Sequence, residues 1–115
     1  VACSGKVFYD LLEARRERKL THVAIIRIEQ LYPFPQDLYA AEIARYPNLS
    51  HLVWCQEEPK NQGAWFESLH HLDRDLPLRL KLRYAGRPHS ASPAVGYYSV
   101  HVEQQQQLVN EALGQ

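Results

Sequence analysis

The sequence predicts a single α/β domain in which helices cover a β-sheet. Three observations predict this class. Short apolar runs typical of strands alternate with longer amphipathic stretches typical of helices along the whole chain. The length of 115 residues fits one domain. The composition, with 45% hydrophobic and 23% charged residues, is that of a globular protein.

The first part of the chain predicts a strand, a helix, a second strand and a second helix. Residues 1–3 are typical of the end of a strand, and the turn at Ser4-Gly5 leads into a helix with its apolar side chains on one face. The β-branched residues within 23–28 predict a strand buried on both faces of a parallel sheet. Prolines end that strand, and Pro35 can open a helix that stops at Pro47.

The middle of the chain continues the alternation. Residues 52–55 predict a third buried strand, residues 56–63 a polar loop, and residues 64–73 a helix. In residues 78–84, leucine or tyrosine alternates with arginine or lysine. This pattern predicts a strand with one face in the core and the other in water or against a polar partner.

The last part of the chain predicts a long connection and a final helix. Residues 86–97 hold two prolines and two glycines, and connections of this length are often functional. Val102, Val109 and Leu113 then mark the apolar side of an amphipathic helix, with residues 104–107 on its solvent side.

The composition excludes two classes of partner. No apolar run approaches the ~20 residues of a membrane-spanning helix. The 13 basic and 13 acidic side chains balance, whereas a nucleic-acid-binding domain usually carries a basic excess. We therefore expect neither a membrane nor a nucleic acid as partner. The chain starts at Val1 and contains no methionine, so we expect it to be a piece of a much longer chain.

Reactive groups are sparse in the sequence. Cys3 and Cys55 are expected to be buried strand residues rather than nucleophiles. The six histidines lack the spacing of metal ligands, so no metal site is expected. Ser4, Gly5 and Lys6 lie at a strand-to-helix turn and form a weak candidate for an anion site, because the glycine-rich loop of a phosphate-binding fold is absent.

The segment after the third strand is the strongest local feature. Glu57 and Glu58 lie at the carboxyl end of a predicted strand, where open α/β sheets place their sites. Paired carboxylates can perform acid–base chemistry, but sequence neighbours on a loop generally diverge. We therefore expect a structural or interface role for this segment. Its candidate residues are Glu57, Glu58, Asn61, Gln62, Gly63 and Trp65.

Four stretches of the chain resemble the closing domain of thiamine-dependent 2-oxoglutarate dehydrogenases. They are residues 3–12, residues 27–35, residues 54–65 and residues 84–96. The second stretch is shared more loosely with other transketolase-like C-terminal domains, whereas the third and fourth narrow the resemblance to the oxoglutarate type. The resemblance runs from Val1 to about Leu113.

The resemblance implies a fold and a parent enzyme. The fold is the transketolase C-terminal type, with three layers around a five-stranded, mostly parallel sheet that carries one antiparallel strand. Residues 78–84 are the candidate for an edge of that sheet. The parent is an oxidoreductase of the citric acid cycle that decarboxylates 2-oxoglutarate on thiamine diphosphate with magnesium. It passes the succinyl group to the lipoyl arm of an acyltransferase partner in a multienzyme complex.

For this chain, the resemblance implies a supporting role. The Gly-Asp-Gly motif of the family's thiamine site is absent, and in family members the cofactor lies between two preceding domains. We therefore expect no catalytic, cofactor-binding or metal-binding residue in this domain. The candidate residues, together with Arg87 and Ser92 of the long connection, would hold the domain against the preceding catalytic domains and support a homodimer.

Three alternatives stay open. One is a regulatory module for a nucleotide or acyl-CoA, based on the Ser4-Gly5-Lys6 turn and on the cationic side chains of Arg79, Lys81 and Arg83. Another is a docking module for the acyltransferase. A third is the relative that acts on 2-oxoadipate. The resemblance places such enzymes in the cytoplasm of bacteria or the mitochondrial matrix of eukaryotes.

Overall fold

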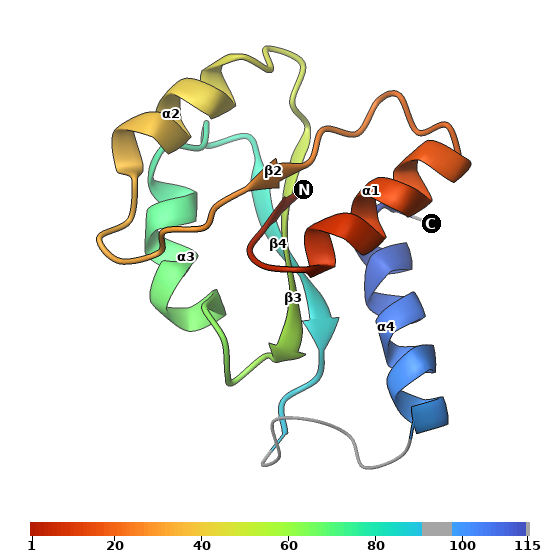
Figure 1. Ribbon diagram of the computed structural model, residues 1–115. Helices are drawn as coiled ribbons and strands as arrows, with labels where there is room; N and C mark the ends of the chain where they lie inside the picture. Colours follow the sequence, from red (N-terminus) through yellow and green to blue (C-terminus); the bar gives the residue numbers. More distant parts are fainter. Residues whose placement is uncertain (91–97, 115) are drawn as a thin grey trace.

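The computed structural model describes residues 1–90 and 98–114 (Figure 1). Strands and helices alternate along the chain, which confirms the α/β class. The elements are β1 (Ala2–Cys3), α1 (Val7–Glu17), β2 (Ile26–Arg27), α2 (Gln36–Ala44), β3 (His51–Pro59), α3 (Trp65–Arg74), β4 (Lys81–Arg87) and α4 (Tyr98–Ala112).

The strands of the described residues form one sheet in the order β2-β1-β3-β4. All three neighbouring pairs are parallel. β4 lies at an edge, as expected for this segment, and the described residues contain no antiparallel strand. The chain passes from β1 outward to β2 and from β3 outward to β4. The order of the strands therefore reverses between β1 and β3, which gives the sheet a topological switch point.

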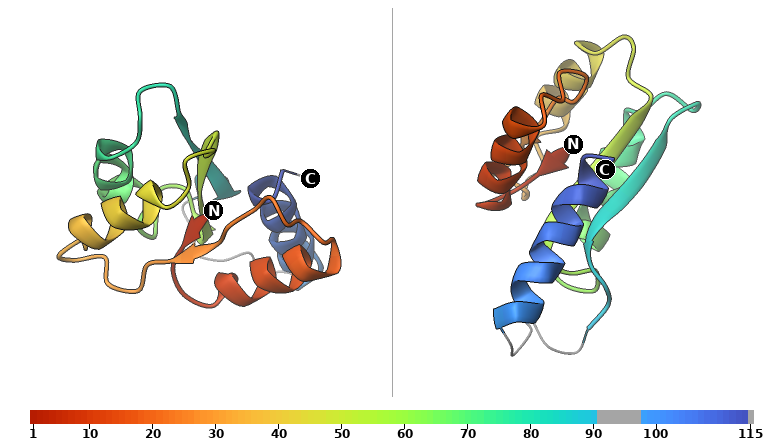
Figure 2. Two further views of the ribbon diagram at one scale, coloured as in Figure 1. Left: turned by 90° about the horizontal axis from the view of Figure 1, so that it is seen from above. Right: turned by 90° about the vertical axis from the view of Figure 1, so that its right-hand side faces the viewer.

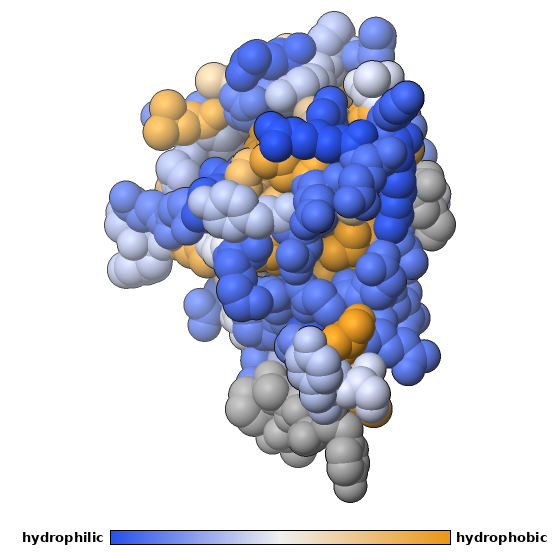
Figure 3. All heavy atoms as spheres, turned by 45° about the vertical axis from the view of Figure 1, so that its right-hand side comes forward, coloured by the Kyte–Doolittle hydropathy of each residue, from blue (hydrophilic) through white to orange (hydrophobic). Residues whose placement is uncertain are grey.

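Helices cover both faces of the sheet, so the domain has three layers (Figure 2). α1 and α4 pack on one face and α2 and α3 on the other. Side chains of β3 alternate between these layers, since Trp54 packs with Tyr39 and Trp65 whereas Cys55 packs with Leu11. Figure 3 shows that hydrophilic residues dominate the outside on the α1 and α4 side.

The structure corrects the predicted polar loop. β3 continues through Gln56 to Pro59, and Pro59 pairs with Arg87 of β4. Polar residues can extend this strand because a buried polar side chain such as Gln56 has hydrogen-bond partners. Glu57 and Glu58 therefore lie within a strand and not in a loop.

The structure also corrects the last strand and the last helix. β4 begins at Lys81, because the backbone N–H of Leu80 donates to the carbonyl of Pro77 at 2.9 Å in a turn that leaves Leu78 in solvent. In α4, Val102 is exposed, whereas Gln104 and Gln105 are half-buried. The solvent side expected for residues 104–107 is thus limited to its last two residues.

Candidate functional site

β1 and β3 are neighbours at the topological switch point, where Cys3 at the carboxyl end of β1 pairs with Cys55 of β3. The carboxyl side of such a switch point is the usual place for a site in an open α/β sheet. Lys6 follows β1, and Glu57 lies near the end of β3. The Lys6 Nζ atom is 2.6 Å from the Glu57 Oε1 atom, with the lysine side chain exposed and the glutamate mostly buried. The structure therefore brings Lys6, one of the anion-site candidates, together with Glu57, one of the two carboxylate candidates.

The turn after β1 already holds a carboxylate of the same chain. The backbone N–H of Gly5 donates to Glu29 Oε1 at 3.1 Å, and Arg27 Nε donates to the same oxygen at 2.6 Å. These hydrogen bonds lower the pKa of the Glu29 carboxyl, and the bond from the Gly5 N–H has the largest effect. Gly5 has φ of 79°, in the left-handed region that favours glycine. The turn thus binds the Glu29 carboxylate at the position where the sequence predicts a candidate anion site.

Arg87 is the central cation of this edge. Its side chain is buried and donates to the backbone carbonyl of Glu57. The guanidinium also donates to Gln104 Oε1 at 3.2 Å and to Gln105 Oε1 at 3.0 Å, and Nη2 lies 3.2 Å from Nδ1 of His101. Arg87 therefore fastens the end of β3 to the first half of α4.

Gln105 connects this cation to the carboxylates around it. Its Nε2 donates to Glu57 Oε1 at 2.9 Å and to Asp10 Oδ2 of α1 at 2.8 Å. The Glu57 oxygen consequently accepts from both Lys6 and Gln105. We call this cluster the carboxyl-edge network, made of Lys6, Asp10, Glu57, Arg87, His101, Gln104 and Gln105. It joins α1, β3, β4 and α4.

We predict that Arg87 and Lys6 contribute very unequally to stability. Arg87→Met should lower the free energy of unfolding by about 2 kcal/mol, because it leaves the Glu57 carbonyl and the half-buried side-chain oxygens of Gln104 and Gln105 without their donor. Lys6→Met should cause no measurable change, because exposed ion pairs contribute little. Urea unfolding of both variants provides the measurement, and equal losses in the two would contradict the buried role of Arg87.

Gln56, which sequence reasoning missed, is the best-connected side chain of the site. It is 2% exposed. Its Oε1 accepts from Trp54 Nε1 at 2.9 Å and from the backbone N–H of Trp65 at 3.1 Å. Its Nε2 donates to the carbonyls of Glu58, Pro59 and Gln62 at 3.2, 3.0 and 2.8 Å, respectively. A glutamine directly after an apolar strand run was the available signal.

Asn61 and Gln62 connect the loop after β3 to the chain after β4. Asn61 Nδ2 donates to the carbonyl of Ser90 at 2.7 Å, and the N–H of Ser90 donates back to Asn61 Oδ1 at 2.9 Å. Gln62 Nε2 donates to the same carbonyl at 3.3 Å. These predicted residues thus contact the long connection, whereas Ser92 lies outside the described residues.

The remaining candidates lie on the α3 side of the sheet. Gly63 has φ of 65°, and a Cβ atom added there would lie 2.6 Å from Oε2 of Glu58. Trp65 is buried, with its ring centroid 5.2 Å from that of Tyr84. Glu58 therefore lies near Gly63 while Glu57 turns toward α4. The two adjacent carboxylates therefore diverge.

The two cysteines are buried neighbours in the sheet, which confirms the expectation for both. Cys3 of β1 pairs in register with Cys55 of β3, and both are 0% exposed. Burial raises the pKa of the Cys3 thiol to about 11 and that of the Cys55 thiol to about 12. Both thiols are therefore neutral at physiological pH and weak as nucleophiles.

We predict that these thiols make the domain less stable in alkali. In the unfolded chain a thiol ionises around its ordinary pKa of 9.0, whereas in the folded chain it keeps its proton until the raised pKa. The contribution of the thiols to stability should therefore be constant below about pH 8. Above pH 9 each thiol should lower the stability by up to about 1.4 kcal/mol per pH unit.

Urea unfolding across pH 7–11 tests this, with the double variant Cys3→Ala, Cys55→Ala as control. The double variant keeps the tyrosines and lysines that also titrate in this range, so it should show a shallower decline. The same decline in both proteins would contradict the prediction.

Two kinds of feature are absent from residues 1–90 and 98–114. No three histidine, cysteine or acidic side chains gather there in a way that could hold a metal ion. None of the helices in this part of the chain has the length and hydropathy needed to span a membrane.

Comparisons with known proteins identify the family. The family described as "2-oxoglutarate dehydrogenase C-terminal" matches residues 1–113. The 2-oxoglutarate dehydrogenase E1 component of Haemophilus influenzae is 58% identical over 113 residues, which are 98% of this chain and 12% of the relative. The E1 component of Cupriavidus necator is 55% identical over 112 residues, 97% of this chain and 12% of the relative.

A eukaryotic relative agrees with the bacterial ones. The protein named "2-oxoglutarate dehydrogenase, mitochondrial" of Schizosaccharomyces pombe is 48% identical over 120 residues, covering 98% of this chain and 12% of the relative. This chain thus spans about an eighth of the length of these relatives. The family match over residues 1–113 and these identities agree with the motifs found above, and the chain belongs to the 2-oxoglutarate dehydrogenase C-terminal family.

Proposed function

We propose that this chain is the non-catalytic C-terminal domain of a thiamine-dependent enzyme component that decarboxylates 2-oxoglutarate and transfers the succinyl group. Its role is to support the packing of the catalytic domains and of the homodimer. The observation that carries the proposal is the carboxyl-edge network. The polar side chains at the switch point are bonded mainly to one another, which suits a rigid supporting surface.

The chemistry of these side chains supports the same division of labour. The Glu57 carboxylate accepts from both Lys6 and Gln105 at one oxygen, as suits a group that fastens β3 to α4. A nucleophile needs a thiolate or an activated hydroxyl, whereas both cysteines are neutral and buried. Thiamine diphosphate and magnesium would require cationic and carboxylate groups that face the ligand, whereas those of the network contact one another. The preceding domains of the parent would therefore bind the cofactor.

Calorimetric titration of the 115-residue chain with thiamine diphosphate and magnesium chloride tests this division. We expect no binding heat, with the full-length E1 component of Haemophilus influenzae as the positive control. Tight binding by the 115-residue chain would overturn the proposal.

A domain exchange tests the supporting role directly. In the E1 component of Haemophilus influenzae, the region matching residues 1–113 is replaced by this chain or deleted. The exchanged protein should keep the native mass and its preference for 2-oxoglutarate over 2-oxoadipate, whereas the deletion should lose assembly. A changed substrate preference in the exchanged protein would show that the domain takes part in substrate choice and would contradict the proposal.

The proposal also includes the complete fold, the partner and the cellular location that the resemblance implies. The complete domain would have the transketolase C-terminal fold, with a five-stranded mixed sheet. The lipoyl-bearing acyltransferase would be the partner of the parent in a multienzyme complex, in the bacterial cytoplasm or the mitochondrial matrix. A pull-down with the peripheral domain of the acyltransferase distinguishes direct docking from indirect assembly.

The regulatory alternative gains less support. The Gly5 N–H, which would face a phosphate, donates to Glu29, and Arg79 donates to the carbonyl of Leu49 at 3.2 Å. Titration with AMP and acetyl-CoA, followed by the fluorescence of Trp54 and Trp65, should produce no change.

A further inference from the structure

A gap interrupts the sheet at its amino edge, between β3 and the residues ahead of β2. β3 begins at His51, but its first pair with β1 joins Trp54 to Ala2. The earlier residues of β3 pair with β4 on one side. On their other side, in line with β1, lies a cavity of about 480 Å³ that reaches residues 22–24 ahead of β2.

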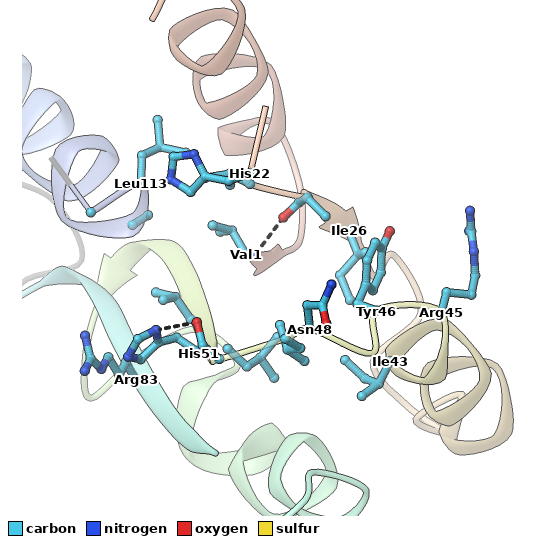
Figure 4. A pocket seen from close by; sticks show the side chains of 18 of the residues that line it. Val1, His22, Ile26, Ile43, Arg45, Tyr46, Asn48, His51, Arg83 and Leu113 are labelled. Carbon is cyan, nitrogen blue, oxygen red and sulfur yellow. Dashed lines mark hydrogen bonds between the residues drawn. The ribbon is translucent and has the colours of Figure 1, made fainter. Parts of the chain in front are cut away.

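The cavity passes through the sheet and is not a groove on one face. Ile43 and Tyr46 line it from the α2 side, and Leu113 lines it from the α4 side. Figure 4 shows Val1 between Leu113 on one side of the cavity and Ile43 and Tyr46 on the other. A ligand pocket on an α/β domain would usually lie at the carboxyl edge of the sheet, whereas this cavity has the position of an inner strand.

The hydrogen bonds around β1 show which backbone groups face the gap. The backbone nitrogen of Val1 donates to the carbonyl of Ala24 at 2.8 Å, and Ile28 N–H donates to the Cys3 carbonyl at 2.8 Å. Residues 1 and 3 therefore face β2, and Ala2, between them, faces β3, because alternate residues of a parallel strand bond to opposite neighbours.

The same alternation shows which backbone groups of β3 and of residues 22–24, the two walls of the gap, point into it. On β3, Val53 and Cys55 face β1, so the N–H of Val53 and the carbonyl of His51 point into the gap. On the other wall, the carbonyl of Ala24 faces β1, and its N–H therefore points the same way. Both walls offer the backbone groups that a strand would use, which is the usual template for pairing with an extended chain.

We propose that an extended apolar segment fills this gap as a direct continuation of β1, and that the residues directly ahead of Val1 in a longer chain of this family supply it. This chain covers only 12% of the length of the relatives it matches, and β1 runs into the gap.

The side chains of β1 alternate between the two layers, since Ala2 packs with the α2 layer and Cys3 with the α4 layer. The residue next to Val1 would therefore face Ile43 and Tyr46, and the one before it Leu113. Both positions favour apolar β-branched residues.

The test extends the 115-residue chain at its amino end by four residues. One extension is Lys-Thr-Val-Ile and the matched control is Lys-Thr-Gly-Ser. A second control, Lys-Thr-Val-Pro, keeps an apolar character but removes the N–H that would donate to the His51 carbonyl. Hydrogen exchange of individual backbone amides is measured by NMR, together with the melting temperature and the mass in solution.

The Val-Ile extension should slow exchange of the Val53 and Ala24 amides at least about tenfold relative to the Gly-Ser control and raise the melting temperature by about 5 °C or more. The Val-Pro control should not reproduce this protection. Equal exchange in all three proteins would overturn the proposal. Protection that appears only in a dimer and disappears on dilution would also overturn it, because a second copy would then be the occupant.

Discussion

Replacing Gln56 by leucine is expected to lower the free energy of unfolding by about 4 kcal/mol, the largest effect of any single side chain in the site. The substitution keeps most of the volume of the side chain but removes all five of its hydrogen bonds. Two buried N–H groups, on Trp54 and on the backbone of Trp65, lose their acceptor. A buried polar group without a partner costs about 1–3 kcal/mol.

Gln62→Leu is the matched control, since it makes the same chemical change in the same segment. Gln62 is half-buried, its side chain bonds to the Ser90 carbonyl at 3.3 Å, and its own carbonyl stays available to Gln56. We expect it to cost less than about 1 kcal/mol. Urea unfolding followed by tryptophan fluorescence measures both. Similar losses for the two variants would contradict the central position of Gln56.

If Gln56→Leu does not fold, Gln56→Glu provides a second measurement. The carboxylate can still accept from Trp54 and Trp65 but cannot donate to the three carbonyls. The indole N–H resonance of Trp54 should then stay near its native position while the stability falls. A Gln56→Glu variant as stable as the native chain would contradict a need for the donor.

Gly86→Ala is expected to cost about 3 kcal/mol, the second largest effect. A Cβ atom added at Gly86 would lie 2.7 Å from Cζ of Tyr84, with the hydroxyl nearer still, and 2.8 Å from the backbone carbonyl of Gln56. Neither neighbour can move freely, because the carbonyl belongs to β3 and the Tyr84 hydroxyl donates to the Arg87 carbonyl at 2.8 Å. The strands must therefore separate locally, and overpacking of this kind costs about 1–3 kcal/mol.

Two comparisons isolate the steric cause. Gly5→Ala, where φ is 79° and no atom lies within 4 Å of an added Cβ, should cost about 1 kcal/mol from backbone strain alone. In a Tyr84→Phe background the cost of Gly86→Ala should decrease, because the hydroxyl nearest to the new methyl group is gone. Thermal or urea unfolding of the four members of this cycle measures the coupling. An unchanged cost in the Tyr84→Phe background would assign the strain to the ring carbon of residue 84 or to the Gln56 carbonyl instead of the hydroxyl.

Much of the fold could be predicted, because its elements depend on patterns local in sequence. The apolar runs give the inner strands, and the prolines around α2 mark its ends. Predictions were wrong where a tertiary contact decides the outcome. Leu78 satisfies the alternation of a strand, but the turn between Pro77 and Leu80 places it in solvent. Val102 satisfies the helical pattern, but the buried guanidinium of Arg87 draws the neighbouring glutamines inward.

The candidate site could likewise be predicted only in part from the sequence. The carboxyl end of β3 could be recognised from polar residues that follow an apolar run. The contact of Lys6 with Glu57 could not be, because it depends on the order of strands in the sheet and joins residues far apart in the chain. Gln56 was missed because a buried amide looks like an ordinary polar loop residue until its partners are known.

The layer formed by α1 and α4 also affects the order in which the domain can fold. Its core combines Cys3 and Val7 from the first residues with Leu108, Val109 and Leu113 from the last. During synthesis, half of the hydrophobic core therefore waits for the final helix to leave the ribosome, while α2 and α3 can already pack on their face of the sheet. Such late long-range contacts slow folding, so the layer formed by α1 and α4 should be completed after the layer formed by α2 and α3.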